Sequence, residues 1–283
     1  MAHYQLGLYE KAMPASLTWK DRMEAVRAAN FDYIELSIDE SDERLARLDW
    51  SRDERKELFN LAQDMGISFG SICLSGHRKY PLGSNDPAIC ARGLDIMDKA
   101  LDLASDLGIR YIQLAGYDVY YEESSADTIQ RFKDHLGKCV GMAAQYGVLL
   151  GFETMETSFM DTVQKAMSYV DAIASPYLGV YPDLGNLTNA SLLYGIPVSD
   201  DLKTGAGHII AAHIKETQPG KYRDVPLKTG HVDFNTVIET CWQLGVRRYV
   251  TELWYQGSDA WRDDIQEAAS LAHEILQPLD KEV

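Results

Sequence analysis

Four side chains of the kinds that bind metal ions stand near the ends of four successive strand-like segments in the second half of the chain. Three carboxylates at one point repel one another and are costly to bury. A divalent cation removes that cost, and three carboxylates with one imidazole suit Mn²⁺, Mg²⁺, Co²⁺ or Zn²⁺. The pattern predicts one divalent metal ion per chain, held by Glu153, Asp183, His213 and Glu252.

Each of these residues, taken alone, has a more ordinary interpretation, because a strand-end Asp or Glu is more often a helix N-cap or a loop residue. Four of them on successive strands favour the metal site instead. His208 is the competing imidazole. It shares a strand face with Ile210 and Ala212, which predicts a structural histidine that points toward the helices. His213 is therefore the expected ligand.

A second group of charged residues follows other predicted strands of an otherwise acidic chain. For any one of them a solvated loop charge is the ordinary interpretation, but their common location indicates a local anion site. The chain has no Gly-x-Gly-x-x-Gly or Walker-type loop, so we expect no organic cofactor. The basic members of the group are Lys11, His77, Arg78, Lys79 and Lys215.

The elements that must position these residues alternate regularly along the chain. Short apolar runs predict strands over Gln5–Glu10, Phe31–Ile38, Ser68–Ser75, Tyr111–Gly116, Leu149–Glu153, Leu178–Asp183, Ile209–Glu216 and Tyr249–Trp254. Amphipathic patterns predict helices over Leu17–Ala29, Arg52–Met65, Ala88–Leu107, Asp127–Tyr146, Asp161–Ala174, Asn235–Leu244 and Asp259–Leu276, with a weak, short helix before the seventh strand. Several helices end at a glycine, which adopts the left-handed conformation cheaply. Eight strand–helix repeats without a linker predict one (β/α)₈ TIM barrel over residues 1–283, with the active site at the carboxyl ends of its strands.

The alternation of side chains along the strands indicates which residues face the barrel axis. In the fifth strand Gly151 and Glu153 are expected inside. In the seventh strand His213 and Lys215 are expected inside and Ile210 outside. A shift of one residue would reverse each of these assignments, because the period is two.

Composition excludes several classes of protein. The 283 residues are 46% apolar and 25% charged, an ordinary globular composition. The net charge of −16 disfavours binding to nucleic acid or to anionic lipid. The sequence shows neither a signal peptide nor an apolar run of roughly 18 residues, so we expect a cytoplasmic protein. The four cysteines are widely spaced and are expected to be free thiols.

The chain resembles the L-ribulose-5-phosphate (L-xylulose-5-phosphate) 3-epimerases of the xylose isomerase-like barrel superfamily over nearly its whole length. The resemblance rests on six runs: Gly7–Ala12, Arg44–Arg52, Cys73–Arg78, Gln113–Tyr121, Tyr181–Asn186 and Gly207–Lys215. It implies metal ligands at the four positions named above, a role in ascorbate and pentose catabolism, and a homodimer. One departure from the family pattern is Lys228-Thr229-Gly230 before His231.

The resemblance implies metal-dependent epimerisation at C3 of a ketopentose 5-phosphate through an enediolate. Glu153 and Glu252 would exchange protons on opposite faces of the substrate, because a single base would return the proton to the face it left. The residues expected to contact the sugar phosphate are Lys11, Glu35, Ser75, His77, Arg78, Glu156, Asn186 and Lys215.

Three alternatives stay open. A free-ketose 3-epimerase or a sugar isomerase would use the same metal and the same enediolate. A metal-dependent endonuclease would need a basic DNA track, which a charge of −16 disfavours. A non-catalytic sugar-binding domain would not need two opposed glutamates.

Overall fold

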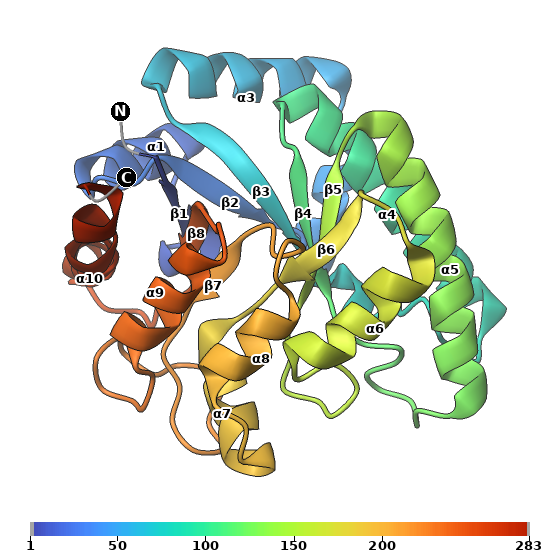
Figure 1. The fold of residues 1–283 in the computed structure, drawn as a ribbon. Helices are drawn as coiled ribbons and strands as arrows, with labels where there is room; N and C mark the ends of the chain where they lie inside the picture. The colour runs from blue at the N-terminus through green and yellow to red at the C-terminus, as the bar shows by residue number, and fades with distance from the viewer. Residues whose placement is uncertain (1–2, 282–283) are drawn as a thin grey trace.

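A ring of parallel strands surrounded by helices makes up the computed structural model, which describes residues 3–281 (Figure 1). The strands are β1 (Gln5–Tyr9), β2 (Tyr33–Ser37), β3 (Ser68–Leu74), β4 (Tyr111–Ala115), β5 (Leu149–Glu153), β6 (Leu178–Tyr181), β7 (Ala212–Ile214) and β8 (Arg248–Thr251). They follow the order β6-β5-β4-β3-β2-β1-β8-β7. Two isolated parallel bridges, Val180 to Ile209 and Asp183 to His213, join β6 to the β7 segment. The predicted barrel fold is confirmed.

The α-helices are α1 (Trp19–Ala28), α2 (Asp42–Leu45), α3 (Arg52–Met65), α4 (Pro87–Leu107), α5 (Ala126–Tyr146), α6 (Val163–Ile173), α7 (Leu184–Tyr194), α8 (Val198–Thr204), α9 (Phe234–Gln243) and α10 (Trp261–Lys281). Short 3₁₀ helices follow β1 (η1, Glu10–Ala12), α2 (η2, Ala46–Asp49) and β3 (η3, Ser75–Arg78). Helices α3, α4 and α5 each end at a left-handed glycine, as predicted.

Two helices, α7 and α8, replace the single weak helix that the sequence predicts before the seventh strand. The amphipathic signal of α7 is faint, because its first half is buried and its exposed second half is also apolar. The side chain of Asp183 nevertheless marks its start, since it accepts a hydrogen bond from the backbone of Asn186 as an N-cap does.

Aromatic and small side chains fill the centre of the barrel. Tyr33 lies wholly inside, and glycines on the neighbouring strands make room for its ring. A Cβ atom on Gly7 would lie 2.2 Å from that ring, and one on Gly70 would lie 2.3 Å from it. On β8, Val250 packs in the same central cluster, and on β2 the side chain of Glu35 is wholly buried beside His213.

Ile210 corrects one assignment of the sequence pattern. Its side chain packs with the central cluster rather than against the helices. Gly151 and Gly179 face it from β5 and β6, and a Cβ on either would lie within 2.8 Å of Ile210 carbon atoms. The two glycines leave a space inside the barrel that Ile210 fills, so the chain departs from regular alternation before β7 begins at Ala212.

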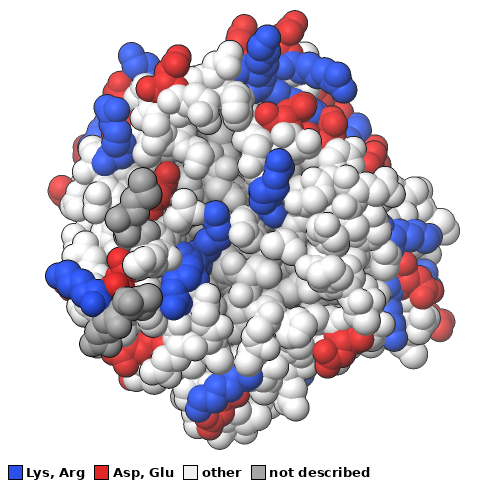
Figure 2. Space-filling model, turned by 45° about the horizontal axis from the view of Figure 1, so that its top comes forward, with Lys and Arg blue, Asp and Glu red and all other residues white. Residues whose placement is uncertain are grey.

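The surface shows mixed charge. On the face in Figure 2, acidic and basic side chains alternate around the rim, and the described residues form no continuous basic track across it. No helix within residues 3–281 has both the length and the apolar character needed to cross a membrane. All four cysteines are buried free thiols, as expected.

Candidate metal centre

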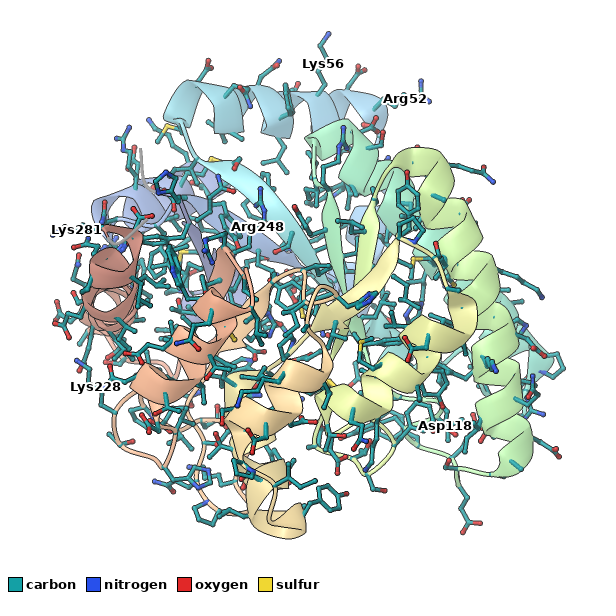
Figure 3. All side chains as sticks on the ribbon, viewed as in Figure 1. Arg52, Lys56, Asp118, Lys228, Arg248 and Lys281 are labelled. Atoms are coloured by element: carbon teal, nitrogen blue, oxygen red, sulfur yellow. The ribbon has the colours of Figure 1, made fainter. Side chains whose placement is uncertain are left out.

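The four predicted metal ligands meet at the carboxyl ends of β5 to β8. Each offers one ligand atom, and these four atoms lie within 4.8 Å of one another. All four side chains are buried. The loops that leave this end of the barrel include those of Asp118 and Lys228, which Figure 3 shows on the side away from Arg52 and Lys56 of α3. The side chains come together as the sequence predicts: Glu153, Asp183, His213 and Glu252.

His213 is oriented by Glu35. Its Nε2 lies 2.7 Å from Glu35 Oε2, while its Nδ1 lies 3.3 Å from Glu153 Oε1 and 3.4 Å from Glu252 Oε2. Burial alone would lower the pKa of His213, but Glu35 and Glu252 raise it well above the ordinary value. Because Nε2 is directed at Glu35, Nδ1 is the ring nitrogen that faces the other ligands.

Asp183 is both a helix cap and a member of the cluster. Its Oδ1 accepts a hydrogen bond of 2.8 Å from the backbone of Asn186, and its own backbone amide donates to Thr154 Oγ1 at 3.0 Å. Its Oδ2 faces the cluster, 2.5 Å from Lys215 Nζ. Burial, and then the neighbouring glutamates, raise the pKa of Asp183 to about 8 despite Lys215. Asp183 is therefore a helix N-cap, and the same residue belongs to the candidate metal cluster.

Two further side chains hold the glutamates in place. Gln113 Nε2 donates to Glu153 Oε2. Lys215 Nζ lies 3.6 Å from Glu252 Oε2 and 2.8 Å from Asn186 Oδ1. Burial opposes ionisation of Glu252, but Lys215 and His213 hold its pKa below the ordinary value. Burial and the charge of Glu252 raise the pKa of Glu153.

The residues present fit a divalent cation. Three buried carboxylates meet here, and among the described residues the cations beside them are Lys215 and the imidazole of His213. Buried carboxylates are costly unless opposite charge balances them, so a divalent cation would suit this point. Three carboxylates and one imidazole are donors that Mn²⁺, Zn²⁺, Mg²⁺ and Co²⁺ accept.

A narrow pocket lies over this cluster. Glu153 and Glu252 line its floor. The predicted contact residues that line it are Lys11, Ser75, Arg78, Glu156, Asn186 and Lys215.

The pocket carries two arginines, Arg78 and Arg223, beside the carboxylate of Glu156. Arg78 stacks 4.9 Å from the ring centre of Tyr120, and its Nε is buried without a hydrogen-bond partner among the described residues. Glu156 accepts a hydrogen bond of 2.6 Å from Tyr117 and lies 3.9 Å from Arg223 Nη2. This wall carries the positive charges of Arg78 and Arg223 and the negative charge of Glu156, so its net charge is positive.

Two residues of the predicted anion site, His77 and Lys79, and one other predicted substrate contact, Glu35, lie elsewhere. His77 is buried beneath η3, where its Nε2 lies 3.0 Å from the Gly93 carbonyl, and burial lowers its pKa to about 4. Lys79 is exposed and pairs with Asp42. Glu35 is wholly buried behind His213 and does not line the pocket. The η3 turn directs the side chains of His77 and Lys79 away from the pocket, whereas Glu35 lies within β2.

Sequence reasoning missed several residues that line the pocket. Tyr9 and Trp254 flank its floor, and Tyr222 and Arg223 enter it from the long connection between β7 and α9. That connection of nearly 20 residues is itself a signal, since loops longer than about 12–15 residues in compact domains are usually functional. Tyr222 and Arg223 stand near its middle.

The departure at positions 228–231 lies outside the pocket. Lys228 approaches Glu274 of α10, and His231 Nε2 lies 2.9 Å from Thr217 Oγ1. Neither side chain lines the pocket over the metal cluster. The departure therefore lies in the β7–α9 connection, outside the described walls of the pocket.

Comparison with known proteins supports this arrangement. A family model described as the xylose isomerase-like TIM barrel matches residues 23–273. A curated relative from Escherichia coli O139:H28 (strain E24377A / ETEC), L-ribulose-5-phosphate 3-epimerase UlaE, is 44% identical over 255 residues, which cover 90% of this chain and 88% of the relative.

Solved structures share the fold at lower identity. D-psicose 3-epimerase from Clostridium cellulolyticum H10, solved with D-tagatose, has a TM-score of 0.80 at 16% identity and covers 96% of this chain and 99% of its own. A xylose isomerase-like TIM barrel protein from Mycobacterium smegmatis was solved in complex with magnesium. It has a TM-score of 0.72 at 17% identity, and the match covers 98% of this chain and 99% of that protein.

Proposed function

This chain belongs to the L-ribulose-5-phosphate 3-epimerase family of xylose isomerase-like TIM barrels, and on that premise we propose that it inverts C3 of a ketopentose 5-phosphate. The preferred substrates in this proposal are L-xylulose 5-phosphate and L-ribulose 5-phosphate. The observation that carries the proposal is the pair of glutamates, Glu153 and Glu252, on the floor of one pocket and on either side of His213 Nδ1.

The two glutamates divide the proton transfer between them. They come from β5 and from the end of β8, so they reach the pocket from two sides of the barrel. One removes the C3 proton and the other delivers a proton to the opposite face, which inverts the carbon. Gln113 orients Glu153, and Lys215 orients Glu252.

The other side chains would hold the metal ion or orient the substrate. Asp183 and His213 would serve as ligands only, together with the glutamates. A divalent cation held by these four residues would supply Lewis acidity, which would make the C–H next to the C2 ketone more acidic. Asn186, held by the Thr154 carbonyl and Lys215, turns its amide toward the pocket, where a sugar hydroxyl would bind.

A phosphate group on the substrate is favoured over a free ketose. Lys11, Arg78 and Arg223 line one small pocket in a chain with a net charge of −16. Charge-assisted contacts to phosphate are stronger than neutral hydrogen bonds. The relative at 44% identity is named for a phosphorylated substrate, and this supports the same class of substrate here.

The test is a proton NMR time course with L-ribulose 5-phosphate in deuterated water. The proposal expects a second pentulose phosphate to form and to carry solvent deuterium at C3. Free L-ribulose is the control, and its kcat/KM should be lower by orders of magnitude. Equal efficiency on the two substrates would favour the free-ketose alternative, and no conversion of either would overturn the proposal.

We also propose that the protein forms a homodimer through the outer end of α7. The residues 184–197 contain no charged side chain, in a sequence that is 25% charged. Leu192, Leu193, Tyr194 and Ile196 are 61%, 67%, 44% and 42% exposed there. Two copies of an acidic chain repel each other least where neither carries charge, so a twofold axis through this surface is favoured.

Sedimentation analysis tests the dimer. The paired change Leu192→Glu and Leu193→Glu places carboxylates on the exposed surface and should give a monomer. Ile129→Glu, on another exposed face, is the control that should leave the dimer intact. A wild-type monomer at micromolar concentration would contradict the proposal.

A further inference from the structure

Behind the pocket wall, a fully buried carboxylate is surrounded by three arginines. Glu10 has no exposed surface. Arg47 donates to both of its oxygens, at 2.7 and 2.8 Å, and Arg22 and Arg44 both pair with its Oε1. The three guanidinium groups and one carboxylate leave an excess of two positive charges. We call these four residues the Glu10 cluster.

The cluster joins two of the sequence runs on which the family resemblance rests. Glu10 belongs to the run Gly7–Ala12, and Arg44 and Arg47 belong to the run Arg44–Arg52. Stability is a weak explanation for them, because a buried ion pair costs about as much in desolvation as it returns. An excess of buried positive charge costs more still.

Glu10 is attached directly to the substrate pocket. Its neighbours in the chain, Tyr9 and Lys11, both line that pocket. The backbone amide of Ser37 donates to Glu10 Oε2 at 2.9 Å, and Ser37 Oγ lies 3.2 Å from the hydroxyl of Tyr9. Fixing the Glu10 carboxylate therefore fixes the end of β1 against the end of β2.

The same attachment reaches the other side of the pocket. The Lys11 carbonyl accepts a hydrogen bond of 2.7 Å from the backbone of Tyr255, three residues after Glu252. The Lys11 ammonium also pairs with Asp39, so the backbone and the side chain of Lys11 are both tied down. A displacement of η1 would move the cation that Lys11 presents to the pocket.

We propose that the Glu10 cluster is a positioning device for substrate binding: it holds Tyr9 and Lys11 in the pocket wall and adds positive charge behind the anionic end of the substrate. None of its members touches the substrate. This inference rests on the proposed function, because the anionic end is the phosphate of the pentulose. Buried charges are screened less by solvent than surface charges, so the excess acts on the pocket.

Arg44→Gln is the most informative variant. Arg44 contacts Glu10 through a single nitrogen, so its loss leaves two arginines on the carboxylate. We expect KM for L-ribulose 5-phosphate to rise about tenfold, because a small shift of a charged contact is costly. The kcat should stay within about twofold of wild type and the metal content should be unchanged. Arg44→Lys should recover part of the KM.

Arg55→Gln is the matched control. Arg55 is similarly buried and pairs with Asp102 and Asp106 between α3 and α4, away from the pocket. It should lower the melting temperature without changing KM. If Arg44→Gln behaves like Arg55→Gln, or if it lowers kcat together with metal content, the proposal is overturned.

A second variant and a second substrate separate the remaining outcomes. Glu10→Gln should also raise KM if it folds; an unchanged or lower KM in this variant would overturn positioning by the carboxylate. If Glu10→Gln does not fold, the KM values of Arg44→Gln and Arg44→Lys test the proposal instead. If the wild type does not prefer L-ribulose 5-phosphate over L-ribulose, the proposed substrate is refuted. If the wild type does prefer it but Arg44→Gln leaves KM unchanged, only the positioning role of the Glu10 cluster is refuted.

Discussion

Glu35 and His213 form a 2.7 Å contact that decides which imidazole nitrogen faces the metal cluster. Glu35 also accepts hydrogen bonds from Ser71 Oγ at 2.7 Å and from the Tyr181 hydroxyl at 2.9 Å. These partners keep Glu35 an acceptor, so His213 donates to it from Nε2 and turns Nδ1 toward the cluster. Glu35 is therefore a positioning residue for the metal ligand rather than a contact of the substrate.

Glu35→Gln should lower metal affinity by about 10–100-fold, the usual effect of losing a hydrogen-bond partner behind a ligating histidine. The amide can donate to Nε2, which would move the imidazole proton to Nδ1 and block ligation. Competition with a chromophoric chelator measures the affinity. Glu43→Gln, on the exposed surface, is the control, and equal affinities in the two variants would contradict this role for Glu35.

Replacing either catalytic glutamate by glutamine should separate ligation from proton transfer. An amide oxygen still ligates a metal, though more weakly, but the amide does not shuttle a proton. Glu153→Gln and Glu252→Gln should keep part of their metal while epimerisation falls by about 10²–10⁴-fold or more. Each variant should retain exchange on one face only, which NMR detects as deuterium at C3 of one epimer without formation of the other. Near wild-type turnover in either variant would remove that glutamate from the mechanism.

The barrel and the metal cluster were predictable because they depend on periodic features. The strand alternation places Glu153 and His213 inside, and the end of each strand fixes their height in the barrel. The exception is Ile210, where space left by two glycines on neighbouring strands overrides the alternation. That space forms only when β5, β6 and the segment before β7 come together, so the sequence of no single strand predicts it.

The walls of the pocket were less predictable because loops set the direction of their side chains. His77 and Arg78 are neighbours in sequence, yet η3 turns His77 into the protein and Arg78 into the pocket. The pairing of Glu10 with Arg47 spans 37 positions and follows no local period. Arg223 lies in a connection without regular structure, where only the length of the loop indicated a function.

Burial of His77 predicts an acid-dependent loss of stability. Its pKa falls from 6.5 to about 4 in the folded protein, because burial disfavours the charged imidazolium. Between these values the unfolded chain binds a proton that the folded chain does not, so stability rises with pH. The contribution is complete above pH 6.5 and is lost as the pH falls toward 4, by about 3 kcal/mol.

The comparison that isolates His77 uses His77→Gln and urea unfolding at several pH values. The free energy of unfolding of the wild type, relative to that of the variant, should decrease as the pH falls from 7 to 4. His208→Gln, at an exposed histidine, is the control substitution. A pH-independent difference between the wild type and His77→Gln would contradict the shift.

Gly230 should tolerate no side chain, because it packs directly on the segment that follows β7. A Cβ there would lie 2.0 Å from the Thr217 carbonyl oxygen and 2.3 Å from Glu216 Oε1. Glu216 Oε1 accepts hydrogen bonds from the backbones of Thr217 and Val232, so the clash would displace both ends of the connection that carries Arg223. Gly230→Ala should cost about 1–3 kcal/mol of stability, as overpacking does, and should raise KM.

Gly141→Ala is the matched control for this change. Gly141 lies within α5, and a Cβ atom added there would meet nothing within 4 Å, so alanine should stabilise the protein by up to about 1 kcal/mol through helix propensity. Denaturant unfolding and steady-state kinetics with L-ribulose 5-phosphate measure the two effects. Loss of stability in Gly230→Ala with an unchanged KM would show that the β7–α9 connection packs independently of the pocket. A raised KM in Gly141→Ala would show that the assay does not separate the pocket from the rest of the barrel. We expect Gly230→Ala to lose stability and to have a raised KM, and Gly141→Ala to show neither effect. That combination would show that the packing of Gly230 on Glu216 fixes the position of Arg223.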